Sequence, residues 1–338
     1  MPSLDDLRDA MREFTAERDW ERYHDPKSLL LALVGEVGEL SALFPVVAGL
    51  AGSQSGGRGA APARTATPPE TVLAGAFVGV DLAWGECART GIAIVNTLGE
   101  LVQVALVRSD DEIEAVVAPY LLGGGIVAVD APIVVNNDSG QRPCERLVGR
   151  YFGKYAASAY PANRGNPAFA DGSRAARIAA RLRLDIDPAT TAGNRMIEVY
   201  PHPAIVMLFG LERTLPYKAK KGRDVVSRRA VFLELMTHLE SLENASQPLR
   251  LDGGPWGGLR RQVEDATRQV DLERAEDQLD AVVCAYIGLL HARAPGSVRT
   301  LGDVDNGYIV TPATPQVAAR IDRDTPHEPR EGVHGGHQ

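Results

Sequence analysis

Apolar positions recur at helical spacing over residues 4–44, and the pattern then stops. Residues 46–74 are rich in Gly, Ala, Ser, Pro and Thr and have no periodicity, which is typical of a flexible linker. A second body, with alternating and fully apolar runs, begins near residue 75. We therefore expect a helical hairpin over residues 1–45, a flexible linker, and a larger domain over residues 75–312.

The second body has the pattern of an α/β domain. Apolar, β-rich runs predict strands over residues 76–82, 89–96, 101–107, 126–132 and 196–199. Helices are expected over residues 110–121, 224–243, 257–273 and 275–292. A mostly polar, helical insertion is expected over residues 136–195, and a disordered tail over residues 313–338, which are too polar to repay the entropy of ordering. This order predicts a mixed sheet flanked by helices.

Composition and charge narrow the class of protein. The 338 residues are 44% apolar, and the net charge of −8 disfavours binding to nucleic acid through bulk charge alone. No apolar run reaches membrane-spanning length, and the N-terminus has no signal-peptide core. The 3 cysteines lie far apart without a CxxC pair, so neither a disulfide framework nor a zinc knuckle is indicated. We expect a cytoplasmic protein that does not bind membranes.

Acidic residues stand where predicted strands end. Asp81 closes the first strand and Asp130 closes the fourth, so both emerge at one edge if these strands are parallel neighbours. Asp277 and Asp280 are three residues apart at the predicted start of the last helix, and they share one face of it. A helix docked on the sheet would carry them to the strand tips, and Glu198 ends the fifth strand. We predict that these acids form the catalytic cluster.

Crowded carboxylates repel one another, and burial favours their protonated form. A divalent cation removes this cost, and ligands that offer only oxygen select Mg²⁺ or Mn²⁺ over zinc. The expected ligands are Asp81, Asp130, Asp280 and Asp277. Two such ions about 3.5–4 Å apart activate water and stabilise the leaving oxygen in phosphodiester hydrolysis. For Asp277 or Asp280 alone, the alternative is a charge that complements the helix dipole.

One segment of this acidic chain is clearly basic. We expect Lys218, Lys220, Lys221 and Arg223 to neutralise substrate phosphates beside the acids, the alternative being a solvated loop. His202 lies between Pro201 and Pro203, and we expect it in a stiff, extended loop near the site. Its candidate roles are general acid or substrate contact, although a lone histidine is more often structural.

Several strings of residues in this second body resemble a known family. They are GVDLAWG (79–85), AVDAP (128–132), EVYPHPA (198–204), YKAKKG (217–222) and EDQLDAVVCAY (276–286). Together they are similar to the domain of unknown function number 429, regarded as a group of predicted nucleases with a ribonuclease H-like fold, over residues 76–312. The resemblance implies that Asp81 is the first-strand catalytic acid, Asp130 the fourth-strand acid, and Asp280 or Asp277 the acid of the last helix. It also implies a nucleic acid or nucleotide substrate.

The N-terminal segment carries a resemblance of its own. LALVGEVGEL (31–40) and the residues before it look like the opening of MazG-like nucleotide pyrophosphohydrolases, the dCTPase branch in particular. In that family the ExxE pair, here Glu36 and Glu39, binds Mg²⁺, and a following helix completes the site; that helix is absent here. Three hypotheses follow: a metal-dependent nuclease, a nucleoside triphosphate pyrophosphohydrolase acting through Glu36 and Glu39, and a non-catalytic nucleotide- or nucleic-acid-binding module. Self-association through the hairpin is a further expectation.

Overall fold

A computed structural model describes residues 75–85 and 88–324. The chain divides into two units, at residues 65 and 66, and the description concerns the second unit. The predicted hairpin over residues 1–45, the linker over 46–74, the pair Glu36 and Glu39, and residues 325–338 of the predicted tail lie outside the described residues.

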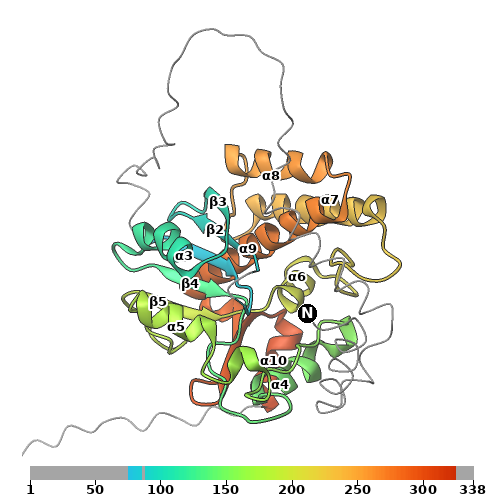
Figure 1. The fold of residues 1–338 in the computed structure, drawn as a ribbon. Coiled ribbons are helices and arrows are strands. Elements are labelled where there is room, and N and C mark those ends of the chain that lie inside the picture. Colours follow the sequence, from blue (N-terminus) through green and yellow to red (C-terminus); the bar gives the residue numbers. More distant parts are fainter. Residues whose placement is uncertain (1–74, 86–87, 325–338) are drawn as a thin grey trace, which may run out of the picture. The chain divides into compact units, whose positions relative to one another are not determined.

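A five-stranded mixed sheet forms the centre of the described domain (Figure 1). Its strands are β1 (Phe77–Asp81), β2 (Thr90–Val95), β3 (Leu101–Val107), β4 (Ile126–Val129) and β5 (Arg195–Glu198). Their order is β3-β2-β1-β4-β5; β2 is antiparallel to β1 and β3, whereas β1, β4 and β5 run parallel. Every residue of β2, β4 and β5 is buried, as expected of strands covered on both faces. The predicted α/β fold with a mixed sheet is confirmed.

Helix α9 (Gln269–Arg293) packs directly on β1 and β2. The approach is so close that a Cβ atom added to Gly79 would lie 1.8 Å from the carbonyl oxygen of Ala281. A Cβ atom on Gly91 would lie 1.9 Å from the carbonyl oxygen of Asp277. Glycine at these two positions therefore lets the backbone of the helix touch the backbone of the sheet, which brings the acidic part of α9 to the ends of the strands.

Further helices surround the sheet and α9. They are α3 (Asp110–Val117), α4 (Pro143–Phe152), α5 (Arg174–Arg181), α6 (Pro201–Phe209), α7 (Val225–Ser241), α8 (Gly254–Glu264) and α10 (Pro315–Asp324). Single 3₁₀ turns lie at Ala118–Leu121, Gly153–Tyr155, Pro167–Phe169, Leu242–Asn244 and Pro295–Ser297. Helices α7 and α8 lie along α9 (Figure 1). None of the helices in the described ranges has both the length and the apolar character needed to cross a membrane.

The C-terminal part differs from the predicted disordered tail. Strands β6 (Val298–Asp303) and β7 (Gly307–Pro312) form an antiparallel hairpin, which the sequence did not predict, and α10 follows it. Helix α10 buries Ala318 and Ile321, and Ile321 joins a small core with residues of α4 and the hairpin. The prediction of disorder over 313–324 was therefore wrong, because Ala318 and Ile321, with the partly buried Val317, are enough to dock a short, otherwise polar helix.

Two expectations about local structure were also wrong. His202 lies in the first turn of α6, not in an extended loop, because proline is favoured at the start of a helix and six apolar residues follow Pro203. Helix α9 begins at Gln269, eight residues before Asp277, so neither Asp277 nor Asp280 lies in its first turn. The dipole of the helix therefore does not explain these two acids, since its effect fades beyond the first turn.

Candidate active site

The carboxyl ends of β1 and β4 bring two of the predicted acids together. Val80 and Val129 are paired in this parallel register, and the next residues are Asp81 and Asp130. The backbone N–H of Asp130 donates to the carbonyl oxygen of Val80 at 2.8 Å. Asp81 and Asp130 therefore leave the sheet at the same edge, as predicted from the apolar runs that precede them.

A cavity of about 540 Å³ lies over this edge of the sheet. Asp81 and Asp130 are among its lining residues, as are Glu198 and His202 of the predicted site. Its cationic lining residues are Arg142, Arg213, Lys218, Lys220 and Arg223. Lys221 is exposed and is not part of the lining, so the predicted basic segment divides into side chains at the cavity and one that faces solvent.

Asp280 lies behind the cavity lining and is fully buried on α9. The hydroxyl of Tyr217 donates a hydrogen bond to its Oδ1 at 2.7 Å. The ammonium group of Lys218 lies 2.8 Å from its Oδ2 and 4.0 Å from a carboxylate oxygen of Glu276. Asp280 therefore has two close partners, one of which also reaches the cavity.

The pKa values of these groups reflect the crowding. Burial, followed by the charge of Asp280, raises the pKa of Asp81 well above its usual value. Burial also raises the pKa of Asp130 to about 7, and the positive charge of Lys218 opposes this rise. Burial alone would lower the pKa of Lys218, but Asp280 and the neighbouring acids hold it well above its usual value. The cluster thus holds more carboxylates than its single ammonium group can neutralise.

The donor set can be compared with the needs of a divalent cation. Asp81 and Asp130 line the cavity and offer hard oxygen donors, and burial and the charge of Asp280 raise the pKa of both. Within residues 75–85 and 88–324, however, no three His, Cys, Asp or Glu side chains are grouped closely enough to hold a metal ion. The chemistry of the two strand-end acids therefore fits Mg²⁺ or Mn²⁺, while the buried third acid, Asp280, is paired with Lys218.

Asp277 stands apart from the strand-end acids. One of its carboxylate oxygens lies 3.5 Å from Nε of Arg89, and the residue does not line the cavity. Burial raises the pKa of Asp277 to about 6, and Arg89 opposes the rise. The structure thus separates the two acids of the last helix: Asp280 contacts the cluster through Lys218, and Asp277 pairs with an arginine beside β2.

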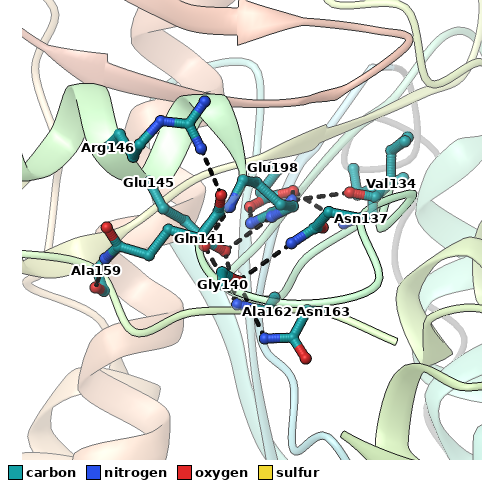
Figure 2. A network of polar contacts seen from close by, with 12 residues as sticks. Val134, Asn137, Gly140, Gln141, Glu145, Arg146, Ala159, Ala162, Asn163 and Glu198 are labelled. Carbon is teal, nitrogen blue, oxygen red and sulfur yellow. Dashed lines mark hydrogen bonds and ion pairs between the residues drawn. The ribbon is translucent and has the colours of Figure 1, made fainter. Parts of the chain in front are cut away.

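Glu198 is engaged in a buried ion pair at the end of β5. Arg142 donates to both of its carboxylate oxygens, at 2.6 and 2.9 Å, and the backbone N–H of Ile133 donates to it at 2.9 Å. The guanidinium also bonds Glu145 at 2.8 Å, and the polar contacts around Glu145 and Glu198 are drawn in Figure 2. Both side chains of the pair are less than 5% exposed, at 2% and 3%. With both carboxylate oxygens engaged by buried donors, Glu198 holds the cavity wall in place.

Aromatic side chains complete the lining of the cavity. Trp84 is 38% exposed and rests edge-to-face on Phe169, with ring centroids 4.9 Å apart. Tyr160 is 79% exposed. His202 stacks on Tyr200 with ring centroids 5.4 Å apart, and burial, assisted by Lys218, lowers its pKa to about 4. His202 is therefore neutral at pH 7, so it offers the cavity a hydrogen-bonding group without a charge.

A known protein family matches the part of the chain that forms most of the cavity. The family described as "Protein of unknown function (DUF429)" matches residues 79–306, which include both strand-end acids, the basic segment and all of α9. The chain belongs to this family. The match thus contains every residue that lines the cavity except Ile309, which lies within β7 (Gly307–Pro312).

The N-terminal part of this DUF429 protein is similar to a different group. It is 65% identical over 43 residues to dCTP pyrophosphatase 1 of Bos taurus, Rattus norvegicus and Homo sapiens. Those residues are 13% of this chain, and they span about a quarter (25%) of each relative's length. No solved structure matches the chain significantly.

Several residues of the site were missed by sequence reasoning. The pair formed by Arg142 and Glu145 carried a weak signal, because a residue three positions before an acid at a helix start often shares hydrogen bonds with it. Arg213 and Tyr160 carried none, because only the fold places them on the cavity. Tyr217 belongs to YKAKKG (217–222), one of the strings that resemble the family. No nearby residue, however, indicates its hydrogen bond to Asp280, which lies 63 residues further along the chain.

Proposed function

We propose that this DUF429 protein is a metal-dependent hydrolase of phosphodiester bonds, with a nucleotide or a nucleic acid as substrate. The observation that carries the proposal is that Asp81 and Asp130 end adjacent parallel strands in one cavity with Lys218, Lys220 and Arg223. An acidic edge suits a divalent cation, and the basic side chains suit the negative charge of the phosphate. The family resemblance to ribonuclease H-like nucleases agrees with this assignment.

Each group has a role in such a reaction. Asp81 and Asp130 would hold Mg²⁺ or Mn²⁺, which supplies an activated water and stabilises charge on the phosphate. Lys218, Lys220 and Arg223 bind the phosphate oxygens and orient the ester toward the acids. Trp84 and Tyr160 offer aromatic faces on which a base can stack. Arg142 keeps Glu198 paired, so the wall beside Asp130 keeps its shape.

The direct test compares variants of the strand-end acids. Asp81→Asn and Asp130→Asn are assayed with Mg²⁺ or Mn²⁺ on labelled single-stranded DNA, single-stranded RNA, duplex DNA and nucleoside triphosphates, with a chelator as blank. We expect each variant to lose at least about a hundredfold in rate, as is common when a group that acts on the transition state is removed. The matched control is Asp138→Asn, which removes an acid whose side chain is 93% exposed. Equal rates in the site variants and the control would refute the proposal.

A second candidate function rests on the N-terminal similarity. The 43 residues that are 65% identical to dCTP pyrophosphatases favour nucleoside triphosphate pyrophosphohydrolysis through Glu36 and Glu39, with missing ligands supplied by other chains. Hydrolysis of dCTP that is lost in Glu36→Gln and kept in Asp81→Asn would support it. If the wild type hydrolyses none of the substrates but Asp81→Asn changes nucleotide or nucleic-acid affinity, the protein is a non-catalytic binding module.

A further inference from the structure

The contact between Lys218 and Asp280 is unusual for a surface lysine. Asp280 is fully buried, and its Oδ2 lies 2.8 Å from the ammonium group of Lys218, whose side chain is 34% exposed. This oxygen accepts no hydrogen bond of good geometry in the described part of the chain, whereas Oδ1 accepts one from Tyr217. The ammonium is therefore held at Asp280 by charge and not by a fixed hydrogen-bond geometry.

The same ammonium group is the positive charge beside all three acids of the cluster. Lys218 lines the same cavity as Asp81 and Asp130, and its ammonium lies 2.8 Å from the carboxylate of Asp280. A divalent cation bound between the strand-end acids would stand close to this ammonium and repel it. A metal ion that takes Oδ2 of Asp280 as its third ligand needs the place that the ammonium holds 2.8 Å from that oxygen, so the ammonium must move for the metal ion to bind there.

The surroundings allow the side chain of Lys218 to move while its backbone stays in place. Nε of Arg228 donates to the carbonyl oxygen of Tyr217 at 2.8 Å, and Arg223 donates to the carbonyl oxygen of Lys218 at 2.7 Å. These bonds fix the main chain on both sides of the lysine. The side chain has four flexible carbon atoms, and Lys218 already lines the cavity beside Lys220 and Arg223. A rotation of the side chain alone can thus move the ammonium from Asp280 to the cavity.

We propose that Lys218 is a tethered counter-cation, which occupies the acid cluster of Asp81, Asp130 and Asp280 until a divalent cation displaces it, and which then turns into the cavity to contact the phosphate of the substrate. This inference rests on the proposed function. Displacement frees Asp280 as a third oxygen ligand and adds a positive charge on the substrate side at the same moment. Lys218 is a positioning residue in the first state and binds substrate in the second.

The test measures metal affinity, without substrate, by calorimetric titration of the full chain with Mn²⁺. Lys218→Met removes the competing charge, so its affinity is expected to rise by at least about tenfold over the wild type. Lys218→Arg keeps the charge, and its affinity is expected to stay at or below that of the wild type. Lys221→Met is the matched control, because it removes the same charge from the same segment at a side chain outside the cavity lining; its affinity is expected to change less than about twofold. Unchanged or weaker Mn²⁺ binding by Lys218→Met would overturn the inference.

A second measurement uses the wild-type chain and does not depend on the folding of a variant. The rate of acetylation of each lysine is measured by mass spectrometry with and without Mn²⁺. Displacement should raise the rate at Lys218 at least about threefold while the rate at Lys221 stays constant, since an ammonium released from its ion pair is easier to deprotonate. A rate at Lys218 that Mn²⁺ leaves unchanged, at concentrations that saturate the titration, would refute the displacement.

The outcomes separate this inference from the proposed function. If Lys218→Met binds Mn²⁺ more tightly than the wild type but the protein cleaves none of the substrates, the hydrolase proposal is refuted and the displacement of Lys218 is supported. If cleavage depends on Asp81 but Lys218→Met has the Mn²⁺ affinity of the wild type, the hydrolase proposal is supported and the displacement of Lys218 is refuted.

Discussion

Gly79 of β1 lies directly against the backbone of Ala281 in α9, where a Cβ atom would come within 1.8 Å of a carbonyl oxygen. Backbone cannot yield as a flexible side chain can, so Gly79→Ala must push α9 away from the sheet. We expect a loss of about 3 kcal/mol in the free energy of unfolding, measured by urea denaturation. Gly149→Ala, in the open interior of α4, is the control and should be neutral or slightly stabilising. A variant Gly79→Ala as stable as the wild type would contradict the described packing.

The ion pair of Arg142 and Glu198 is buried, and its loss should be costly. Arg142→Met leaves the carboxylate of Glu198 buried without its bidentate partner, and we expect a loss of about 3–5 kcal/mol in the free energy of unfolding. The double variant Arg142→Met, Glu198→Gln should lose less than the two single variants added together, because it no longer leaves the charge of Glu198 without its partner. Arg181→Met, which breaks an exposed pair with Asp111, serves as the control and should leave the unfolding midpoint unchanged. Additive losses in the double variant would contradict the pairing.

His202 gives the protein an acid-sensitive element. Its folded pKa of about 4 lies below its usual value of 6.5, so the unfolded chain binds the proton more readily than the folded one. The stability that this group contributes is complete above pH 6.5 and is lost as the pH falls toward 4. Denaturation curves at pH 7 and pH 4.5 should therefore show that the wild type loses stability relative to His202→Gln on acidification. A difference between the two proteins that does not vary with pH would contradict the burial of the ring.

Tyr160 tests the nature of the substrate. It is 79% exposed at the cavity, so its removal should cost little stability, but it would remove a stacking surface for a base. We expect Tyr160→Ala to raise KM for single-stranded nucleic acid about tenfold and to leave kcat nearly constant. Leu122→Ala is the control, because it truncates an apolar side chain that is 63% exposed and lies outside the cavity lining. An unchanged KM would argue for a substrate without a base at this position.

Local pattern was enough to predict the strand-end acids and not enough to predict their partners. Asp81 and Asp130 follow short apolar runs, and the order of strands puts both at one edge, so their proximity could be deduced from the chain alone. The pairing of Lys218 with Asp280 joins residues 62 positions apart through a side-chain contact. No periodicity records such a contact, because it depends on how α9 lies on the sheet.

Helix ends were the weakest part of the sequence prediction. The apolar pattern of α9 was found, but residues 269–273 were assigned to the preceding predicted helix, 257–273, so α9 was expected to begin near residue 275. For α6, the two prolines around His202 suggested an extended loop, although proline is compatible with the first turn of a helix. In both cases the direction of a candidate side chain depended on a boundary that propensity alone does not determine.

The family match ends at residue 306, in the turn between β6 and β7, whereas the folded domain continues to Asp324. All residues of β7 are buried, and Val310 forms a parallel bridge to Val199, the residue that follows Glu198. A recombinant fragment trimmed to the match would lack this strand, strip the cover from one wall of the cavity and expose the edge of β5 to other chains. If such a fragment is insoluble, the cause would be the position of the cut. A fragment that extends to Asp324 should be soluble.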